Sequence, residues 1–206
     1  MSEISEKSSR MELLRKIKDE VVNFEDSPLY KERIRNRVYP VIGEGNHFAE
    51  IMFVGEAPGR TEAETGRPFS GAAGKVLDEM LKSIGIERED VYITNVVKDR
   101  PSNNRDPLPE EISLYAPFLD RQIEIIRPKV IVALGRHSMK YLMEKFGIVE
   151  NNSTITKIHG KVYEAQVSFG SIKFMPMYHP ATVLYNFEIR EKLEEDFKKL
   201  KGLLEQ

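Results

Sequence analysis

The sequence predicts an α/β fold, a three-layer α/β/α sandwich with a central, mostly parallel four-stranded sheet. Two observations predict it. Four short runs are solidly apolar instead of alternating, which is typical of strands buried on both faces of a parallel sheet. Helical patterns separate these runs, and strands that alternate with helices are characteristic of α/β proteins. The 206 residues suit one domain with a sizeable core, which we expect over residues 10–206.

The first half of the chain alternates between helix and strand. Residues 1–9 read as a disordered tail, and apolar residues at helical spacing predict a helix over about 11–23, which Pro28 ends. An apolar run over 50–55 ends in glycine and is a buried strand. A helix between two glycines follows over 71–85, and residues 91–94 form the second strand.

The second half continues the alternation. Pro109 at a first-turn position opens a helix towards residue 126. Residues 130–135 form a third strand, and a helix follows to about residue 145. Residues 155–169 alternate like a hairpin around Gly160, and residues 173–178 form a further strand. A closing helix is predicted by an apolar stripe: Ile189, Leu193, Phe197, Leu200 and Leu204.

Composition excludes several kinds of protein and site. No apolar run is long enough to span a membrane, and the start of the chain lacks the apolar region of a signal peptide. We therefore expect a cytoplasmic protein. Separately, we expect a monomer. The chain has no cysteine, which excludes disulfides, thiolate metal sites and cysteine nucleophiles. Its four histidines are not at zinc-site spacings, so we expect no bound metal.

Local charge indicates more than the net charge of -2. Basic residues gather over 31–37, around Lys98 and Arg105, and at 136–140. One basic face can bind phosphates on a nearly neutral protein. For any single cluster, a solvated surface is the favoured alternative.

The glycine-rich loops do not fit nucleotide-binding motifs. The turn from Gly55 to Gly59 lacks the glycine spacing of a dinucleotide site. The Gly-Lys pair at Gly74 resembles a phosphate loop, but Phe69 replaces its first glycine and Val76 its Ser or Thr. Small residues at the start of this helix either approach a DNA phosphate or pack closely on the sheet. On the first alternative, the DNA contacts are Gly71 and Lys75.

Three motifs, each placed where an apolar strand ends, point to a binding site at one edge of the sheet. They are Gly55-Glu56-Ala57-Pro58-Gly59 with Gly66-Arg67-Pro68-Phe69, then Thr94-Asn95-Val96-Val97-Lys98, then Tyr178-His179-Pro180-Ala181. In order and spacing the chain resembles the family 4 uracil-DNA glycosylases over residues 28–184. The resemblance implies the uracil-DNA glycosylase-like fold. It also implies an enzyme that flips uracil out of DNA and hydrolyses its N-glycosidic bond, leaving an abasic site for base excision repair.

The resemblance also implies a substrate site. Phe69 is the ring on which uracil stacks, with a core ring as the alternative role. Asn95 carries the donor and acceptor that pair with uracil N3 and O4, with a turn cap as its alternative. Gly55 and Gly59 shape the loop around the base. Glu62 crowds the C5 side of the base and excludes thymine, or is an exposed loop carboxylate.

For catalysis the resemblance points to His179, which donates to uracil O2 as negative charge develops there. Backbone N–H groups around Glu56 and Ala57 share that task. Ala57 stands where other uracil glycosylase families place a water-activating group, so we expect a dissociative reaction with late capture of water. Residues 181–185 meet the minor groove. Further candidate DNA contacts are Lys98, Arg105, Pro180 and Ala181.

The family holds a four-iron cluster on four cysteines, and this chain departs from that pattern. The ligand positions fall at Phe24, Ser27, Asp99 and Tyr115. None is a thiolate, so we expect no cofactor. We expect the four positions to meet in space, with the aromatic rings in the cluster's volume and the Tyr115 hydroxyl bonded to Asp99 or Ser27.

Two alternatives to a cluster-free uracil-DNA glycosylase stay open. The first is a DNA-binding or damage-sensing protein with weak or no catalysis. The second is a glycosylase of altered base range, such as hypoxanthine or xanthine. The presence of Asn95 and His179 favours the uracil-DNA glycosylase.

Overall fold

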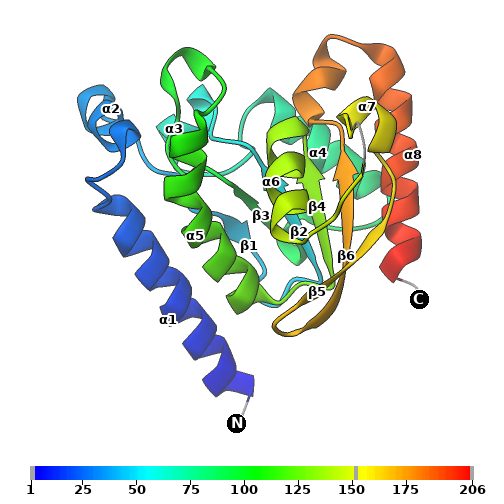
Figure 1. Cartoon of the computed structure of the whole chain (residues 1–206), viewed down its shortest axis with the longest axis horizontal. Helices are drawn as coiled ribbons and strands as arrows, with labels where there is room; N and C mark the ends of the chain where they lie inside the picture. The colour runs from blue at the N-terminus through cyan, green and yellow to red at the C-terminus, as the bar shows by residue number, and fades with distance from the viewer. Residues whose placement is uncertain (1–2, 151–152, 205–206) are drawn as a thin grey trace.

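A six-stranded mixed sheet forms the centre of the molecule, in the strand order β1-β3-β2-β4-β6-β5 (Figure 1). The computed structural model describes residues 3–150 and 153–204. Four strands are parallel: β2 (Ile51–Gly55), β3 (Tyr92–Asn95), β4 (Val130–Leu134) and β6 (Gly170–Met177). These four are the predicted parallel strands. The predicted total of four strands was wrong, because antiparallel strands β1 (Glu44–Gly45) and β5 (Tyr163–Val167) extend both edges.

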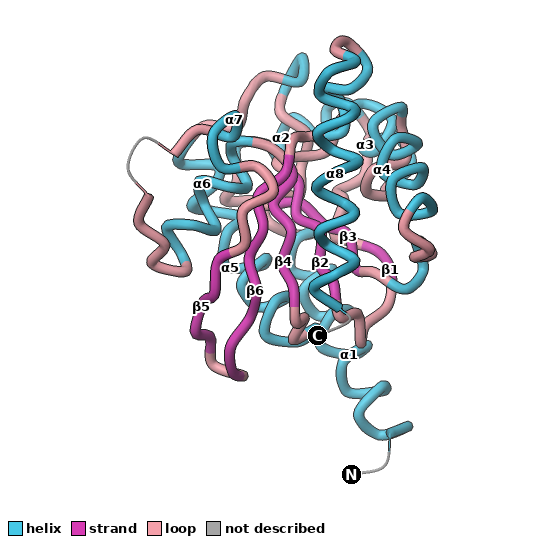
Figure 2. The backbone as a smooth tube through the Cα atoms, turned by 90° about the vertical axis from the view of Figure 1, so that its right-hand side faces the viewer, coloured by secondary structure: helices cyan, strands magenta, loops and turns pink. Residues whose placement is uncertain are grey.

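Helices cover both faces of the sheet, so the expected sandwich of three layers is confirmed (Figure 2). On one face lie α1 (Glu3–Val22), α5 (Pro109–Ile126) and α6 (Arg136–Lys145). On the other lie α4 (Ala72–Ser83) and α8 (Phe187–Leu204). Every residue of β2, β3 and β4 is buried, which explains why these strands are solidly apolar or end in a small or amide residue.

Side chains alternate between the two layers of core, as the period of two along a strand requires. In β2, Met52 and Val54 pack under α1, α5 and α6, whereas Ile51 and Phe53 pack under α4 and α8. The Phe53 ring stacks on that of Phe197 in α8, 5.8 Å between centroids. The core is therefore divided by the sheet, and the helices of each face are fixed by one set of alternate residues.

The remaining elements are short. They are α2 (Pro28–Asn36), α3 (Arg60–Thr65), α7 (Ile155–Ile158) and the 3-10 helices η1 (Arg88–Asp90), η2 (Ser102–Asn104) and η3 (Pro180–Leu184). None of the helices within the described ranges is long and apolar enough to cross a membrane.

Two predicted segments differ from the structure. The expected tail is helical from Glu3 onwards, as the first turns of α1; residues 1–2 lie outside the described residues. Polar residues carry this part of the helix, so no apolar stripe marks it. The expected hairpin around Gly160 was also wrong. Residues 155–158 form α7, and the hairpin turns at 168–169, where β5 pairs with β6.

The four parallel strands end at one edge of the sheet, and this positions the loops that carry the three motifs. Gly55 at the end of β2 pairs with Asn95 at the end of β3. Leu134 and Met177 pair in the same way at the ends of β4 and β6, one residue before Gly135 and two before His179. Segments far apart in the sequence thus meet at the carboxyl edge, where open α/β sheets bind ligands.

Candidate active site

A cavity of about 380 Å³ opens at this edge of the sheet. Loops after β2, β3 and β6 line it, together with the segment that follows η2. The predicted site residues that it brings together are Glu56, Ala57, Gly59, Glu62, Phe69, Asn95, Arg105, His179 and Ala181. Asn104 and Asp106 also line the cavity, and neither was a predicted site residue. Their signal was present in the Asn104-Arg105-Asp106-Pro107 segment after the second strand.

Gly55 brings the two predicted base contacts together. A Cβ on Gly55 would lie 2.3 Å from Asn95 Oδ1 and 2.9 Å from the Phe69 ring, so both side chains pack over its bare Cα. Asn95 and Phe69 are almost fully buried at the cavity wall. An aromatic face beside a carboxamide offers stacking and directional hydrogen bonds to one planar base.

The backbone of Phe69 is in the left-handed region, with φ of 47°, which is uncommon for an aromatic residue. Gly74 makes this conformation possible, because a Cβ there would lie 1.7 Å from the Phe69 carbonyl oxygen. Such strained positions persist where the surroundings fix them, and they gather at functional sites. Gly74, the glycine of the Gly-Lys pair, therefore allows the Phe69 backbone to pack closely against α4.

His179 is held as a neutral hydrogen-bond donor. It follows β6, and its Nδ1 accepts a hydrogen bond from the Ala181 N–H at 3.1 Å. The proton of the neutral ring therefore lies on Nε2. Burial lowers the pKa of His179 to about 4, although part of the side chain still faces the cavity. Its ring stacks against Phe69, with 5.5 Å between centroids.

The Glu56-Ala57 segment is tied to the strand beside it. Val96 N–H donates to Gly55 O at 3.0 Å, and Val97 N–H donates to Glu56 O at 2.9 Å. Ala57 lines the cavity with a methyl group, so it offers neither a base nor an acid there. The side chain of Glu56 is half-buried, and burial raises its pKa.

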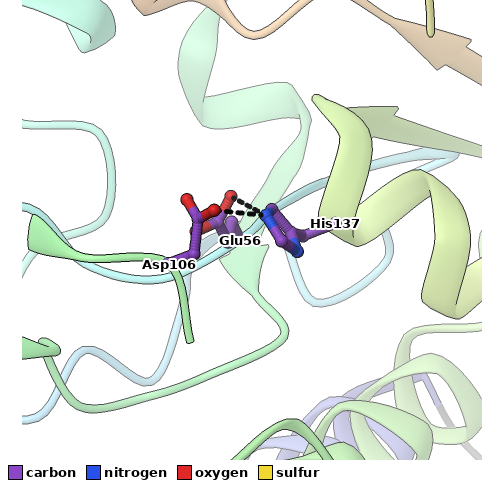
Figure 3. Close-up of side chains that lie close together, drawn as sticks. All are labelled: Glu56, Asp106 and His137. Carbon is purple, nitrogen blue, oxygen red and sulfur yellow. Dashed lines mark ion pairs between the residues drawn. The ribbon is translucent and has the colours of Figure 1, made fainter. Parts of the chain in front are cut away.

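Glu56 also belongs to a cluster with Asp106 and His137, drawn in Figure 3. The His137 Nε2 lies 3.8 Å from a Glu56 oxygen and 3.4 Å from an Asp106 oxygen. Three such ligands could hold a metal ion, but the Arg136 side chain already contacts two of them. Its Nε donates to His137 Nε2 at 3.0 Å, and its guanidinium pairs with Asp106. The Arg136 guanidinium thus already supplies a cation at the Asp106 carboxylate.

Glu62 caps the helix that the sequence offered to a DNA phosphate. Its Oε1 accepts from the Gly71 N–H at 2.8 Å, just before α4. A Cβ on Gly59 would lie 2.6 Å from Glu62 Oε2, so this carboxylate lies between the two glycines. The Gly71 N–H is therefore engaged by a protein carboxylate, while Lys75 is exposed on the first turn of α4.

The other candidate DNA contacts differ in accessibility. Arg105 lines the cavity and forms two hydrogen bonds to the buried carboxylate of Glu111, at 2.8 and 2.5 Å. Ala181 faces the cavity and Pro180 is buried behind it. The prediction that Lys98 contacts DNA was wrong. Its side chain has 0% exposure, and its amine is surrounded by acceptors within the core.

An exposed apolar segment follows the His179 motif. Leu184 is 46% exposed, Tyr185 89% and Phe187 73%. They lie at the end of η3 and the start of α8, directly after the residues that line the cavity. Large exposed apolar side chains close together indicate a contact surface.

The four positions of the expected cluster converge. The rings of Phe24 and Tyr115 meet edge to face, with 5.4 Å between centroids. The Tyr115 hydroxyl donates to Asp99 at 2.6 Å. Ser27 is buried beside them, where its Oγ accepts from the Leu29 N–H and begins α2.

The partner of Asp99 is Arg33, a pairing that was not predicted. Its Nη1 lies 3.0 and 3.1 Å from the two carboxylate oxygens, and the two side chains are 4% and 1% exposed. Arg33 also donates to Val21 O at the end of α1. Arg33 belonged to the basic stretch 31–37 that was read as surface. Its spacing of four residues from the buried Leu29, on one face of a helix, was the available signal.

Comparison with known proteins identifies relatives along most of the chain. Residues 42–201 match the family model of the Uracil DNA glycosylase superfamily. The chain is 54% identical over 194 residues to a type-4 uracil-DNA glycosylase of Sulfurisphaera tokodaii, covering 94% of this chain and 86% of that protein. It is 50% identical to one of Archaeoglobus fulgidus, covering 92% of each chain. With one of Thermotoga maritima it shares 42% identity, over 95% of this chain and 97% of that protein.

Proposed function

This chain belongs to the uracil-DNA glycosylase superfamily and is a uracil-DNA glycosylase of the type 4 kind, and from this premise we propose how its cavity removes uracil from DNA. The proposal is carried by one observation. Asn95, Phe69 and His179 reach the same cavity from three different segments, and each has the chemistry that one step needs.

Base recognition is the task of Phe69 and Asn95. The flipped uracil stacks on the Phe69 ring, while the Asn95 carboxamide accepts from N3–H and donates to O4. Cytosine has the opposite pattern at these two positions, so its binding leaves the buried Asn95 amide unpaired. An unpaired buried polar group costs about 1–3 kcal/mol, which disfavours cytosine. Glu62, held by Gly71, limits the space beside the base and excludes thymine.

Bond cleavage depends on His179. When the bond between uracil N1 and the sugar C1′ breaks, its electron pair leaves with uracil and the sugar becomes cationic. The Nε2–H of neutral His179 donates to uracil O2, where negative charge develops, and the Glu56 and Ala57 N–H groups assist. Water then adds to C1′, and its proton neutralises the departing uracil. Ala57 offers no base to activate that water, which supports a dissociative reaction.

DNA reaches this site through the surface around the cavity. Lys75 supplies positive charge beside the flipped nucleotide, Arg105 lies at the cavity wall in its pair with Glu111, and Ala181 approaches the DNA backbone. Residues 181–185, with the exposed Tyr185 ring, enter the minor groove and occupy the space that the flipped base leaves.

The residues at 24, 27, 99 and 115 do not fit an iron–sulfur cluster. Such a cluster needs thiolates, and the chain has none. Two aromatic rings and the Arg33–Asp99 ion pair fill the volume instead. We therefore propose that the enzyme works without a cofactor, as a monomer formed by one domain that includes α1 from Glu3.

The test is an assay on an oligonucleotide with a single uracil, followed by alkali to cut abasic sites. Strand scission at the uracil position, and none with thymine or cytosine there, supports the proposal. Parallel substrates that contain hypoxanthine or xanthine measure the base range. A protein that binds the uracil oligonucleotide and leaves it intact would be a damage sensor, and the proposed roles would fall.

A further inference from the structure

Lys98 is a charged side chain enclosed in the core next to the base-reading residue. Its Nζ donates to three acceptors: Thr94 Oγ1 at 2.8 Å, Gln122 Oε1 at 2.6 Å and Asn95 O at 2.6 Å. All four residues are buried. An ammonium group has three N–H donors, so each finds one acceptor.

The acceptors are themselves held in place. Gln122 donates through Nε2 to Ile42 O at 2.9 Å and to the Tyr92 hydroxyl at 3.2 Å. Thr94 Oγ1 donates to Ile42 O at 2.7 Å. The amine is thus the central donor of a closed network that runs from α5 to the end of β3.

Burying an amine is unfavourable, and a chain under selection for stability alone would fill this place with an apolar side chain. Burial lowers the pKa of Lys98 well below its usual range, and the negative charge of Asp120 opposes this. The three hydrogen bonds of the amine instead link Thr94, Gln122 and the Asn95 carbonyl to one point in the core.

The contact with Asn95 O acts on a single peptide group. Lys98 binds the carbonyl of the Asn95–Val96 peptide, and Gly55 O accepts from its Val96 N–H at 3.0 Å. Because the peptide is planar, bonds at both ends fix its orientation and the ψ angle of Asn95. That angle sets the direction of the Asn95 Cα–Cβ bond relative to this peptide, and from that bond the side chain extends to the cavity wall.

We propose that Lys98 is a positioning residue for base recognition, which acts from within the core by holding the Asn95 carbonyl so that the Asn95 amide meets uracil. The inference rests on the proposed role of Asn95. It predicts that loss of the Lys98 amine lowers the rate of uracil excision through Asn95 and through no other residue.

The experiment compares Lys98→Met with Gln122→Met by single-turnover excision, binding to uracil-containing DNA and thermal unfolding. Gln122→Met is the matched control. It breaks the same buried network and leaves the contact between Lys98 and Asn95 in place. We expect Lys98→Met to lower the excision rate by roughly 10- to 100-fold, since small misplacements of reacting groups cost that much, with DNA binding little changed. Gln122→Met lowers stability and changes the rate less than about 3-fold.

The same Lys98 substitution is then made in an Asn95→Ala background. If Lys98 acts through Asn95, it lowers the rate no further there. A folded Lys98→Met enzyme with the parental rate overturns the inference, as does a loss of rate that is equally large without the Asn95 amide.

If Lys98→Met does not fold, Lys98→Met/Gln122→Met removes the donor together with one acceptor and is compared with Gln122→Met. A chain that folds in neither form assigns Lys98 to core stability and overturns the inference. Failure of the proposed function gives a different result: Asn95→Ala then excises uracil at the parental rate, or the parental chain excises none.

Discussion

His179 illustrates how local bonding decides chemistry at the scale of one residue. The Ala181 N–H occupies Nδ1, and enclosure in the cavity disfavours the charged ring. Both effects favour the neutral tautomer with its proton on Nε2. A neutral donor binds ground-state uracil weakly, because uracil O2 carries little charge there. It binds the developing anion of the transition state more strongly, and this difference lowers the barrier to cleavage.

Substitution of His179 by Ala tests this role. We expect single-turnover cleavage to fall by roughly 100- to 1000-fold, the usual effect of removing one such donor, while uracil-containing DNA binds almost as before. Rate and equilibrium binding are measured on one preparation of the variant. Equal losses in both would make His179 a DNA contact, and no loss in either would make it structural.

The pH dependence of the rate follows from the same group. With a pKa of about 4, His179 stays neutral from pH 8 to about pH 5, so cleavage is level there and falls as pH approaches 4. Stability has a related window. The pKa of His179 in the folded protein lies below its usual 6.5. The contribution of the neutral ring to the free energy of unfolding is therefore fully present above pH 6.5 and is lost as pH falls towards 4.

A pH series of single-turnover rates, with NMR titration of the His179 ring, measures both effects. Glu56→Gln is the control, because Glu56 also lines the cavity and burial raises its pKa. A midpoint that moves or disappears in that variant would assign the pH dependence to Glu56.

Gly55 gives a third prediction at this scale. A methyl group there would lie 2.3 Å from Asn95 Oδ1 and 2.9 Å from the Phe69 ring, so Gly55→Ala must displace one or both. We expect excision to fall about 100-fold, because reacting groups misplaced by an ångström cost that much. Gly202→Ala, where a methyl group meets nothing within 4 Å, is the control and retains full activity. Normal activity in Gly55→Ala would show that the base contacts lie elsewhere.

At the scale of elements, one buried ion pair and its hydrogen bonds join four segments. Arg33 in α2 binds Asp99 in the loop after β3 and the carbonyl groups at the end of α1, while Tyr115 in α5 donates to the same carboxylate. Burial raises the pKa of Asp99, and the bonds from Tyr115 and Arg33 oppose that rise. The pair thus connects the N-terminal helices to the loop beside the cavity.

Arg33→Met should destabilise the protein by about 3–5 kcal/mol, because it leaves the Asp99 carboxylate buried without its cation. Arg33→Met/Asp99→Leu should cost less, since no charge is left unpaired. The control is Arg60→Met, which breaks an exposed pair with Glu64 and costs at most about 1 kcal/mol. Denaturant unfolding of the variants measures these values. Equal costs for Arg33→Met and Arg60→Met would mean that the buried pair does not stabilise this region.

At the scale of the whole molecule, the absence of thiolates leads to a prediction about metal. The purified enzyme should be colourless and contain no stoichiometric iron, and chelators should change neither its melting temperature nor its excision rate. Absorbance spectra and elemental analysis check the first statement. Iron bound in a fixed ratio to the chain would contradict it, whichever residues held the metal.

The sequence predicts much of the fold and of the candidate site. Solidly apolar runs marked the parallel strands, and the polar motifs that follow β2, β3 and β6 had to meet because parallel strands end at the same edge. The two edge strands were not predicted, for different reasons. Strand β1 has only two residues, and the alternation of β5 was assigned to a hairpin placed too early in the chain.

The sequence by itself determined the α/β class, the grouping of Phe69, Asn95 and His179, and the loss of thiolate chemistry at four positions. Only the tertiary structure decided that Lys98 is a core residue, that Arg33 pairs with a carboxylate 66 residues away, and that Glu62 occupies the Gly71 N–H. The physical reason is that burial of a charge depends on which distant groups offer it hydrogen bonds. Periodicity reports the face of an element, but the partners that make a buried charge tolerable come from other elements.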